Sequence, residues 1–378
     1  MARFYFFLQK GTTGPRAGLL RFETGLEVKT PLFMPVGTQG SVKAMGQEDL
    51  ESIGYRLILA NTYHLYLRPG LELMAKLGGL KKFMAWPYAL LTDSGGFQAF
   101  SLSSLREYRD DGVLFRSHWD GSRHYFNPRK VLEIQRILES DIVMPLDDCA
   151  EYPATPERLS LALERTHRWL QDSVEYYISS GMNEKQSLFG IIQGGVEEEF
   201  REKSVQFVTT LPLPGFAIGG LSVGEKNEEF LKALRFTCAL LPVEKPRYLM
   251  GVGSIPEILA AVESGVDMFD CVLPTRNARN GQLLTSEGKI NLRNEKFKDR
   301  ADPPDPRCGC PVCQRYTLAY LRHLHKSREI LAYMLSTYHN LYFMYHFMDS
   351  MRLAIFEDRW TSFKEGYLKV YTSKSPAA

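Results

Sequence analysis

Three cysteines lie close together near the end of the 378-residue chain. Cys308, Cys310 and Cys313 form the pattern C-x-C-x-x-C, with Gly309 and Pro311 inside it. Thiolates this near in sequence can converge on one tetrahedral zinc ion, which usually takes its fourth ligand from Cys or His. Gly and Pro favour a loop at this place, so the pattern argues against three unrelated thiols in a core. We therefore predict a metal site.

Spacing alone leaves the fourth ligand of this site open. No fourth cysteine lies nearby, and four histidines follow the cluster: His323, His325, His339 and His346. A site with three Cys and one His has no open position for water, so the expected role of the zinc is structural. The other cysteines are scattered and do not form a disulfide framework: Cys149, Cys238 and Cys271.

A second group of reactive residues follows short apolar runs of the chain. Three of these runs end in carboxylates, at Asp93, Asp147 and Asp270, and a fourth ends in the amide of Gln193. Carboxylates are costly to bury beside strands unless they bind something. The alternative is that each one caps the helix that follows it. The set as a whole favours a binding or catalytic site.

The elements that must position these residues are eight apolar runs. They begin near residues 31, 56, 89, 141, 188, 216, 247 and 268. Continuous apolar runs are typical of parallel strands that are buried on both faces. Between them, helix starts are indicated at Asn127-Pro128, Thr155-Pro156 and Ser254-Ile255-Pro256. Eight strands alternating with helices over roughly 245 residues predict a (β/α)8 barrel, in which the strand ends face one opening.

Composition and charge limit the broad class. Hydrophobic residues make up 44% and charged residues 24%, which are ordinary globular values. Neither a signal peptide nor an apolar run of about 18 residues is recognisable, so we expect a soluble, cytoplasmic protein with no membrane partner. The net charge is +2, yet twelve Lys or Arg face six Asp or Glu between Thr275 and Ile330. Such a segment is either a footprint for phosphate or a solvated surface.

Several motifs occur together in a fixed order. They are TDSGGFQ from Thr92, GIIQGG from Gly190, AIGGLSVGE from Ala217, YLMGVGS from Tyr248, FDCVLPTRNAR from Phe269 and CGCPVC from Cys308. This set resembles the bacterial-type tRNA-guanine transglycosylases of the queuosine pathway, over nearly the whole chain. The resemblance implies a single (β/α)8 catalytic domain over residues 1–378, with a zinc-binding, tRNA-contacting subdomain at residues 281–345.

The resemblance also implies a reaction, that of a pentosyltransferase. Such an enzyme exchanges the guanine at the wobble position of a tRNA anticodon for a 7-deazaguanine, and the expected incoming base here is 7-aminomethyl-7-deazaguanine. Asp270 matches the nucleophile that attacks C1′ of the ribose and forms a covalent intermediate. Asp93 matches the general acid and base. Asp147 matches the residue that reads the N–H edge of the base, with Asp148 as an alternative one residue along.

Further site residues are implied in the same way. Gln193 and the backbone N–H of Gly220 match donors to the purine carbonyl, and Phe97 and Met250 match a sandwich around the purine, although such side chains are often core. The rest of the base site is Ser94, Gly95 and Gly96. Two segments match tRNA contacts: Gly251, Val252, Gly253, Ser254, Ile255, Pro256 and Glu257; and Thr275, Arg276, Asn277, Ala278 and Arg279. The resemblance selects His339 as the fourth zinc ligand and implies a homodimer.

Two other functions are weighed against this one. A non-catalytic tRNA-binding subunit would not need both Asp93 and Asp270. A metal-dependent hydrolase would need a His and carboxylate site at the strand ends, where only His64 is available. The chain departs from the family pattern at Ser222 and in residues 149–155. Both departures lie near the expected base pocket and leave the choice among aminomethyl, nitrile and queuine bases open.

Overall fold

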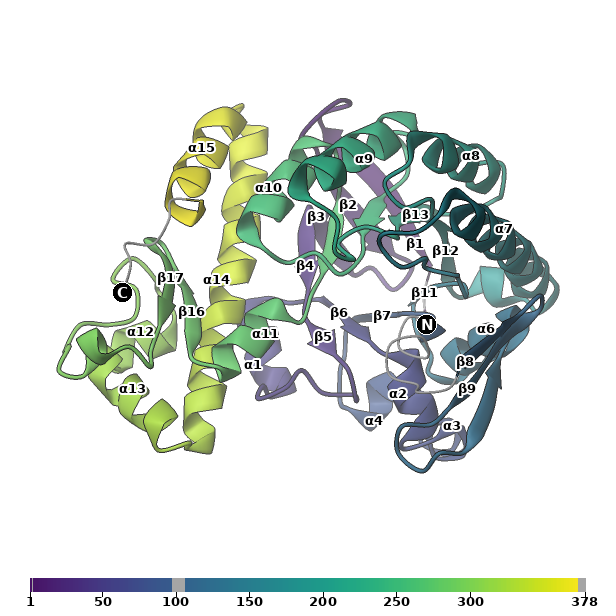
Figure 1. Cartoon of the computed structure of the whole chain (residues 1–378). Helices are drawn as coiled ribbons and strands as arrows, with labels where there is room; N and C mark the ends of the chain where they lie inside the picture. The colour runs from purple at the N-terminus through teal and green to yellow at the C-terminus, as the bar shows by residue number, and fades with distance from the viewer. Residues whose placement is uncertain (2, 97–105, 373–378) are drawn as a thin grey trace.

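The structure is a computed structural model that describes residues 1, 3–96 and 106–372. Its centre is a parallel barrel (Figure 1) whose strands pair in the order β4-β15-β14-β13-β12-β11-β7-β6-β5. The bounds of these strands are β4 (Leu32–Met34), β5 (Val36–Gly37), β6 (Leu57–Ala60), β7 (Ala89–Thr92), β11 (Ile142–Val143), β12 (Ser187–Ile192), β13 (Gly215–Ile218), β14 (Arg247–Leu249) and β15 (Met268–Asp270).

The barrel closes through its first strand. β4 pairs with β15 and β5 pairs with β6, and only Pro35 separates β4 from β5 along the chain. Proline has no N–H for the ladder, so it divides one strand into two segments. The carbonyl of Pro35 still accepts a 3.0 Å hydrogen bond from the N–H of Leu59. Counted as one strand, β4 and β5 complete the eight strands that the sequence predicts, and all eight apolar runs are confirmed as strands.

Helices surround the barrel, and others form part of the C-terminal region beside it (Figure 1). Those described are α1 (Gln47–Ile53), α2 (Thr62–Leu67), α3 (Leu71–Lys76), α4 (Gly79–Phe83), α6 (Pro128–Ile137), α7 (Pro156–Ser179), η1 (Met182–Glu184), α8 (Glu198–Val208), α9 (Asn227–Leu240), α10 (Ile255–Glu263), α11 (Leu273–Arg279), η2 (Glu295–Phe297), α12 (Pro311–Arg315), α13 (Leu318–Lys326), α14 (Ile330–Phe356) and α15 (Trp360–Tyr371). Among the described residues, no helix is both long and apolar enough to cross a membrane.

The predicted helix starts are confirmed, each with a capping side chain. Asn127, Thr155 and Ser254 accept hydrogen bonds from the backbone N–H groups at the third helical position of α6, α7 and α10. A proline lies in the first turn of each helix, where its missing N–H costs nothing. These caps fix where each helix leaves the barrel.

Alternate residues of the strands fill the barrel interior. The inward-facing side chains come from every strand and form one apolar cluster: Leu32, Met34, Leu57, Leu59, Ala89, Leu91, Ile142, Met144, Phe189, Ile191, Ala217, Tyr248 and Met268. Phe4, Leu20 and Phe22 join it from an antiparallel sheet of β1 (Phe4–Lys10), β2 (Ala17–Phe22) and β3 (Glu27–Thr30). This sheet closes the end of the barrel at which the strands begin, which leaves the opposite end for a site.

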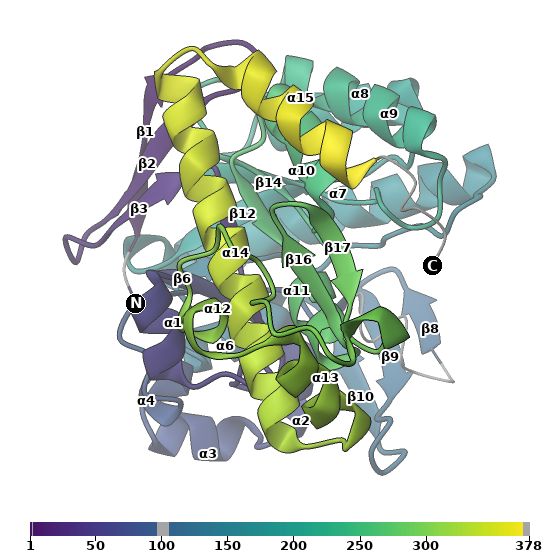
Figure 2. The same ribbon diagram turned by 90° about the vertical axis from the view of Figure 1, so that its left-hand side faces the viewer.

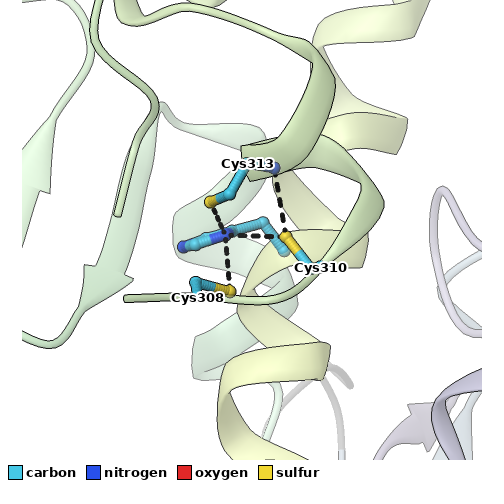
Figure 3. Close-up of side chains that lie close together, drawn as sticks. Cys308, Cys310 and Cys313 are labelled. Atoms are coloured by element: carbon cyan, nitrogen blue, oxygen red, sulfur yellow. Dashed lines mark hydrogen bonds between the residues drawn. The ribbon is translucent and has the colours of Figure 1, made fainter. Parts of the chain in front are cut away.

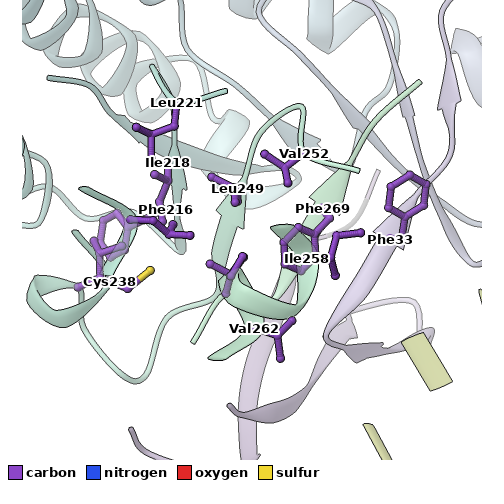
Figure 4. Packing of buried hydrophobic residues seen from close by; sticks show 14 of the residues in the cluster. Phe33, Phe216, Ile218, Leu221, Cys238, Leu249, Val252, Ile258, Val262 and Phe269 are labelled. Carbon is purple, nitrogen blue, oxygen red and sulfur yellow. The ribbon is translucent and has the colours of Figure 1, made fainter. Parts of the chain in front are cut away.

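The outward-facing residues pack against the helices. Figure 4 shows Phe216, Ile218, Leu249 and Phe269 on the strands, with Ile258 and Val262 of α10 beside them. The side chains on both faces of these strands are therefore apolar, as the continuous runs predict. A second antiparallel sheet extends from the barrel: β8 (Arg106–Arg109), β9 (Gly112–Arg116) and β10 (Arg123–Phe126).

The C-terminal part of the chain adds a small cysteine-containing lobe beside the barrel. It holds the hairpin of β16 (Gln282–Thr285) and β17 (Gly288–Asn291) with α12, α13 and the start of α14, as Figure 2 shows. Its own small core includes Leu283, Phe297 and Leu321. α14 continues without a break past residue 345, the expected end of the subdomain, and its second half packs on the barrel. The lobe is thus fixed to the barrel by a shared helix.

Candidate active site and metal centre

A cavity of about 480 Å³ opens at the carboxyl ends of the barrel strands. That volume lies within the range of about 300–1,000 Å³ typical of small-molecule sites. Residues at the ends of all eight strands line it, including most of the predicted base-site residues: Asp93, Ser94, Asp147, Gln193, Gly220, Met250 and Asp270. The tertiary structure therefore brings together carboxylates that lie up to 177 residues apart in the sequence.

Asp270 is the last residue of β15 and is held through one oxygen. The hydroxyl of Tyr248 donates to Oδ1 at 2.6 Å, and the backbone N–H of Gly251 donates to the same atom at 2.8 Å. Among the described residues, no hydrogen bond reaches Oδ2, so this oxygen is left for a ligand. Burial raises the pKa of Asp270, and the two donors oppose that rise.

Asp93 follows β7 and is held through both oxygens. The backbone N–H of Thr62 donates to Oδ1 at 2.8 Å, and the side-chain amide of Asn61 donates to Oδ2 at 2.5 Å. Burial, reinforced by the negative charge of Asp270, nevertheless raises the pKa of Asp93 to about 7. A carboxyl group with such a pKa can both give and take a proton near neutral pH.

The neighbours Asp147 and Asp148 have different environments. Asp147 lines the cavity and accepts a 2.7 Å hydrogen bond from Nε2 of Gln193, and burial raises its pKa to about 6. Asp148 is fully buried beneath it, paired with Arg158 at 2.6 Å and with Arg165 at 2.5 Å. The family resemblance selected Asp147 and kept Asp148 as an alternative one residue along. Only Asp147 has access to a ligand.

Gln193 and Gly220 lie in direct contact on the wall of the cavity. Gly220 has a φ of +65°, and a side chain at this position would collide with Oε1 of Gln193. Glycine is therefore required both by the backbone conformation and by the close approach. The side-chain amide of Gln193 carries two N–H groups, and Asp147 accepts one of them.

The remaining base-site residues differ in what they offer. Ser94 and Met250 line the cavity. Gly95 and Gly96 do not, and both pack closely: a side chain on Gly95 would lie 2.8 Å from the backbone nitrogen of Tyr63, and one on Gly96 would lie 3.0 Å from Leu146. Their contribution is a tight turn after β7. Phe97 lies outside the described residues.

The two predicted RNA segments are largely buried. In the first, Gly251 is exposed, whereas Val252 and Ile255 are buried and Ser254 caps α10. In the second, which forms α11, Thr275 and Ala278 are buried, and Arg276 is exposed and lines the cavity. Direct side-chain contact with a ligand at the opening is therefore available to Arg276 in particular.

Sequence reasoning missed the residues that hold the carboxylates. Tyr248 lies within β14, beside the strand that carries Asp270, whereas Asn61 and Thr62 directly follow β6, beside the strand that precedes Asp93. Tyr248 begins the motif YLMGVGS, but the motif does not show that the hydroxyl of Tyr248 donates to Asp270. Asn61 and Thr62 follow the second apolar run, where the polar pair was a usable signal.

Two cysteines also border the cavity, Cys149 and Cys271. Burial raises the pKa of each thiol to about 12. A thiol with such a pKa stays protonated at neutral pH and is a poor nucleophile. The reactive groups of the site are therefore the carboxylates.

The predicted metal ligands converge in the lobe. The sulfurs of Cys308, Cys310 and Cys313 point toward one another (Figure 3) and lie 3.9, 3.4 and 3.3 Å from Nδ1 of His339. With Zn–S near 2.3 Å and Zn–N near 2.0 Å, a tetrahedral site requires sulfur and nitrogen about 3.6 Å apart. The four ligand atoms lie within 4.8 Å of one another. The cluster can therefore hold a metal ion.

The environment of His339 fits a ligand through Nδ1. Its Nε2 lies 2.8 Å from the carbonyl of Leu284, which can only accept a hydrogen bond. Nε2 therefore carries the proton, and the lone pair of Nδ1 can bind a metal ion. His339 is fully buried on α14. In the part of the chain that the structure describes, this is the only group of three or more Cys, His, Asp or Glu with metal-site spacing.

Comparison with known proteins gives a consistent result. The model of a family described as "Queuine tRNA-ribosyltransferase" matches residues 11–373. A protein of that name from Leptospira biflexa is 54% identical over 343 residues, covering 89% of this chain and 92% of its own. One from Halothermothrix orenii is 50% identical and covers 96% of both chains. One from Thermodesulfovibrio yellowstonii is 49% identical, covering 94% of this chain and 92% of its own.

Proposed function

Because the chain belongs to the queuine tRNA-ribosyltransferase family, we propose that it exchanges guanine at the wobble position of tRNA for a 7-deazaguanine. The observation that supports this most directly is the pair of half-buried carboxylates, Asp93 and Asp270, in one cavity. A non-catalytic RNA-binding subunit would have no use for either group in this setting. The proposed incoming base is 7-aminomethyl-7-deazaguanine.

Asp270 acts as the nucleophile in this proposal. Its free oxygen, Oδ2, attacks C1′ of the guanosine ribose while the bond from C1′ to N9 of guanine breaks. The electron pair of that bond leaves with guanine, and the ribose is joined to the enzyme through an ester. The phosphodiester backbone takes no part in either step. Tyr248 and Gly251 hold Oδ1, which orients the carboxylate for attack.

Asp93 transfers the protons. In the first step its neutral form gives a proton to the departing guanine, and in the second its anionic form removes a proton from the incoming base. N9 of that base then attacks C1′ and releases Asp270. Two inversions at C1′ retain the configuration. Asp147 and Gln193 are proposed to bind the polar edge of the base, with the N–H of Gly220 as a further donor and Met250 on its face.

The raised pKa of Asp93 predicts opposite pH dependences for the two half-reactions. Formation of the enzyme–RNA adduct needs protonated Asp93 and should slow as pH rises above about 7. Discharge of the adduct by the incoming base needs the anion and should slow as pH falls. In the adduct Asp270 is an uncharged ester, so its charge no longer helps to raise the pKa of Asp93, and the midpoint should lie lower than in the first half-reaction. Single-turnover rates of each half-reaction from pH 5.5 to 8.5 would measure this. Asp93→Asn should remove both dependences, and an unchanged profile in that variant would exclude Asp93 as the proton carrier.

The metal of the lobe is proposed to be one structural zinc ion. Three thiolates and one imidazole complete a tetrahedron and leave no position for substrate. The ion would supply folding energy to the lobe, and the chemistry would stay with the carboxylates at the barrel opening.

The lobe also carries an apolar surface that fits the expected homodimer. Ile330, Leu331 and Met334 at the start of α14 are exposed, as is Tyr320 of α13, and Ile330 is 74% exposed. Exposed apolar patches of this kind mark interfaces. Met334→Glu should shift the protein toward monomer in sedimentation velocity. Leu240→Glu, at an exposed apolar position at the end of α9, is the matched control and should leave the sedimentation coefficient unchanged. Monomeric wild-type protein at micromolar concentration would contradict the assignment.

The direct test of the function is base exchange. Purified protein would be incubated with tRNA that has guanine at the wobble position and, separately, with labelled guanine and the aminomethyl, nitrile and queuine bases. Mass analysis of the digested tRNA identifies the inserted nucleoside. Guanine incorporation supports the transglycosylase assignment, and insertion of the aminomethyl base supports the proposed substrate. A tRNA left unlabelled by every base would refute the proposal.

A further inference from the structure

Trp119 stands out among the four tryptophans of the chain. It is 45% exposed, whereas Trp86, Trp169 and Trp360 are all buried. It lies in the turn between β9 and β10 and borders a cavity together with Tyr66 and Leu67 of α2. A large aromatic surface kept in water at the tip of a hairpin loses hydrophobic burial, so its presence there needs a reason.

The indole is held in a defined position. The guanidinium of Arg68 lies over the ring at 4.0 Å, and the backbone N–H of Trp119 donates to Oγ of Ser117 at 3.2 Å. A cavity of about 250 Å³ lies beside the ring, bordered by Tyr66 and His124. The platform is therefore preorganised, with a cation on one side and an open hollow next to it.

A row of rings connects this platform to the active-site cavity. The ring of Trp119 lies 5.1 Å from that of His118, which lies 5.5 Å from that of His64. His64 lines the active-site cavity. His118 is itself fixed by a 2.8 Å hydrogen bond to the hydroxyl of Tyr63. Trp119 is thus two ring-to-ring steps from the site at which the guanosine is proposed to react.

We propose that Trp119 is a stacking platform for a nucleobase that flanks the exchanged guanosine in single-stranded RNA. The inference rests on the proposed function, because it assumes that the substrate is RNA. Extraction of the target base from its stack exposes the faces of its neighbours, and an aromatic side chain can replace the lost stacking. Stacking on an indole accepts any base, so this contact adds affinity without adding sequence preference.

The surrounding charges suit the backbone of such an RNA. Arg68 covers the indole, and Lys43 is exposed. Burial lowers the pKa of His64, and the nearby His118 and Lys43 lower that pKa further. Both cations are available to phosphates that pass from the active-site cavity toward Trp119. Asp120 is the acidic residue at the platform, and its Oδ1 is occupied by Ser122.

Intrinsic fluorescence offers a direct test, because the other tryptophans are buried. An RNA hairpin that carries the anticodon loop should quench the emission and protect it from acrylamide. Hairpins with an abasic nucleotide immediately 5′ or 3′ of the target guanosine would be compared with the complete hairpin. Loss of quenching with one of the two supports the proposal and identifies the stacked base. Equal quenching by all three hairpins, or none by any, would overturn it.

Kinetics provide a second, independent measurement. Trp119→Ala should raise KM for the hairpin about 5- to 30-fold and leave kcat nearly unchanged. Trp119→Phe keeps a stacking face and should stay within about threefold of wild type. Tyr5→Ala removes another exposed aromatic side chain, from β1, and should have no effect. An unchanged KM in Trp119→Ala would overturn the proposal.

These outcomes separate the two hypotheses. If wild-type protein exchanges guanine while the Trp119 variants bind and react normally, the platform is wrong and the proposed function stands. If wild-type protein exchanges no base into any tRNA, the proposed function itself fails. Protection of Trp119 from acrylamide by protein concentration alone would show that a second copy covers the ring, and would also overturn the platform.

Discussion

Asp270→Asn should abolish guanine exchange, with a fall in kcat of at least about a thousand-fold. Asparagine keeps the shape of the side chain and can still accept the hydrogen bonds of Tyr248 and Gly251, but its amide is not a nucleophile at C1′. The measurement is exchange of labelled guanine into tRNA. Denaturing gel electrophoresis of enzyme with RNA should show a covalent adduct for wild type and none for the variant.

Asp147→Asn is the matched control for this variant. It changes a half-buried carboxylate in the same cavity, which is proposed to bind the base and to form no bond with ribose. Adduct should still form, with a raised KM for the incoming base. Melting temperatures of both variants would verify that the fold is intact. Exchange at the wild-type rate by Asp270→Asn would remove the proposed mechanism.

The second large effect is expected from loss of the metal. Structural zinc sites contribute on the order of 10 kcal/mol of binding energy in isolated zinc-finger peptides, and here that energy would hold together a lobe with a small core. Chelation, or Cys310→Ser, should therefore unfold residues 281–345. Hydrogen exchange measured by mass spectrometry should show loss of protection in β16, β17, α12 and α13, while the barrel strands stay protected.

Loss of the metal should also change the residues that line the active-site cavity. Asn340 is next to His339 on α14 and donates a 2.9 Å hydrogen bond to the carbonyl of Pro274. This bond joins α14, which carries a metal ligand, to α11, which carries Arg276. RNA binding should weaken together with the lobe. Arg276→Ala tests the RNA contact by itself, since it should keep the metal and lower RNA affinity. The control is Cys238→Ser, which replaces a buried cysteine outside the cluster and should leave the metal bound. Full protection of the lobe in metal-free protein, with loss of turnover alone, would contradict a structural role.

The sequence predicted the barrel well because its signals are local. Each strand is a short continuous apolar run, and three helices begin with a capping side chain followed by a proline in the first turn. The metal cluster was also local, since three of its four ligands lie in six residues. None of these signals depends on how the chain is folded at a distance.

What the sequence could not decide by itself depends on the alternation of side chains and on contacts across strands. Whether Asp147 or Asp148 meets the cavity depends on which one has arginine partners beneath it, and those come from α7. The choice of His339 among four histidines rested on family resemblance, and the geometry now places its Nδ1 among the three sulfurs.

The sequence by itself therefore determined the fold class, the set of carboxylates at the strand ends and the cysteine part of the metal site. Only the tertiary structure decided how each group is tuned. The pKa of Asp93 rises to about 7 because the closed barrel buries it near Asp270, 177 positions away in the chain. Among the described residues, Asp270 keeps one oxygen free of hydrogen bonds because Tyr248, on the neighbouring strand, and Gly251, just after that strand, hold the other. Burial and long-range pairing set these properties, and neither is written in the local pattern of residues.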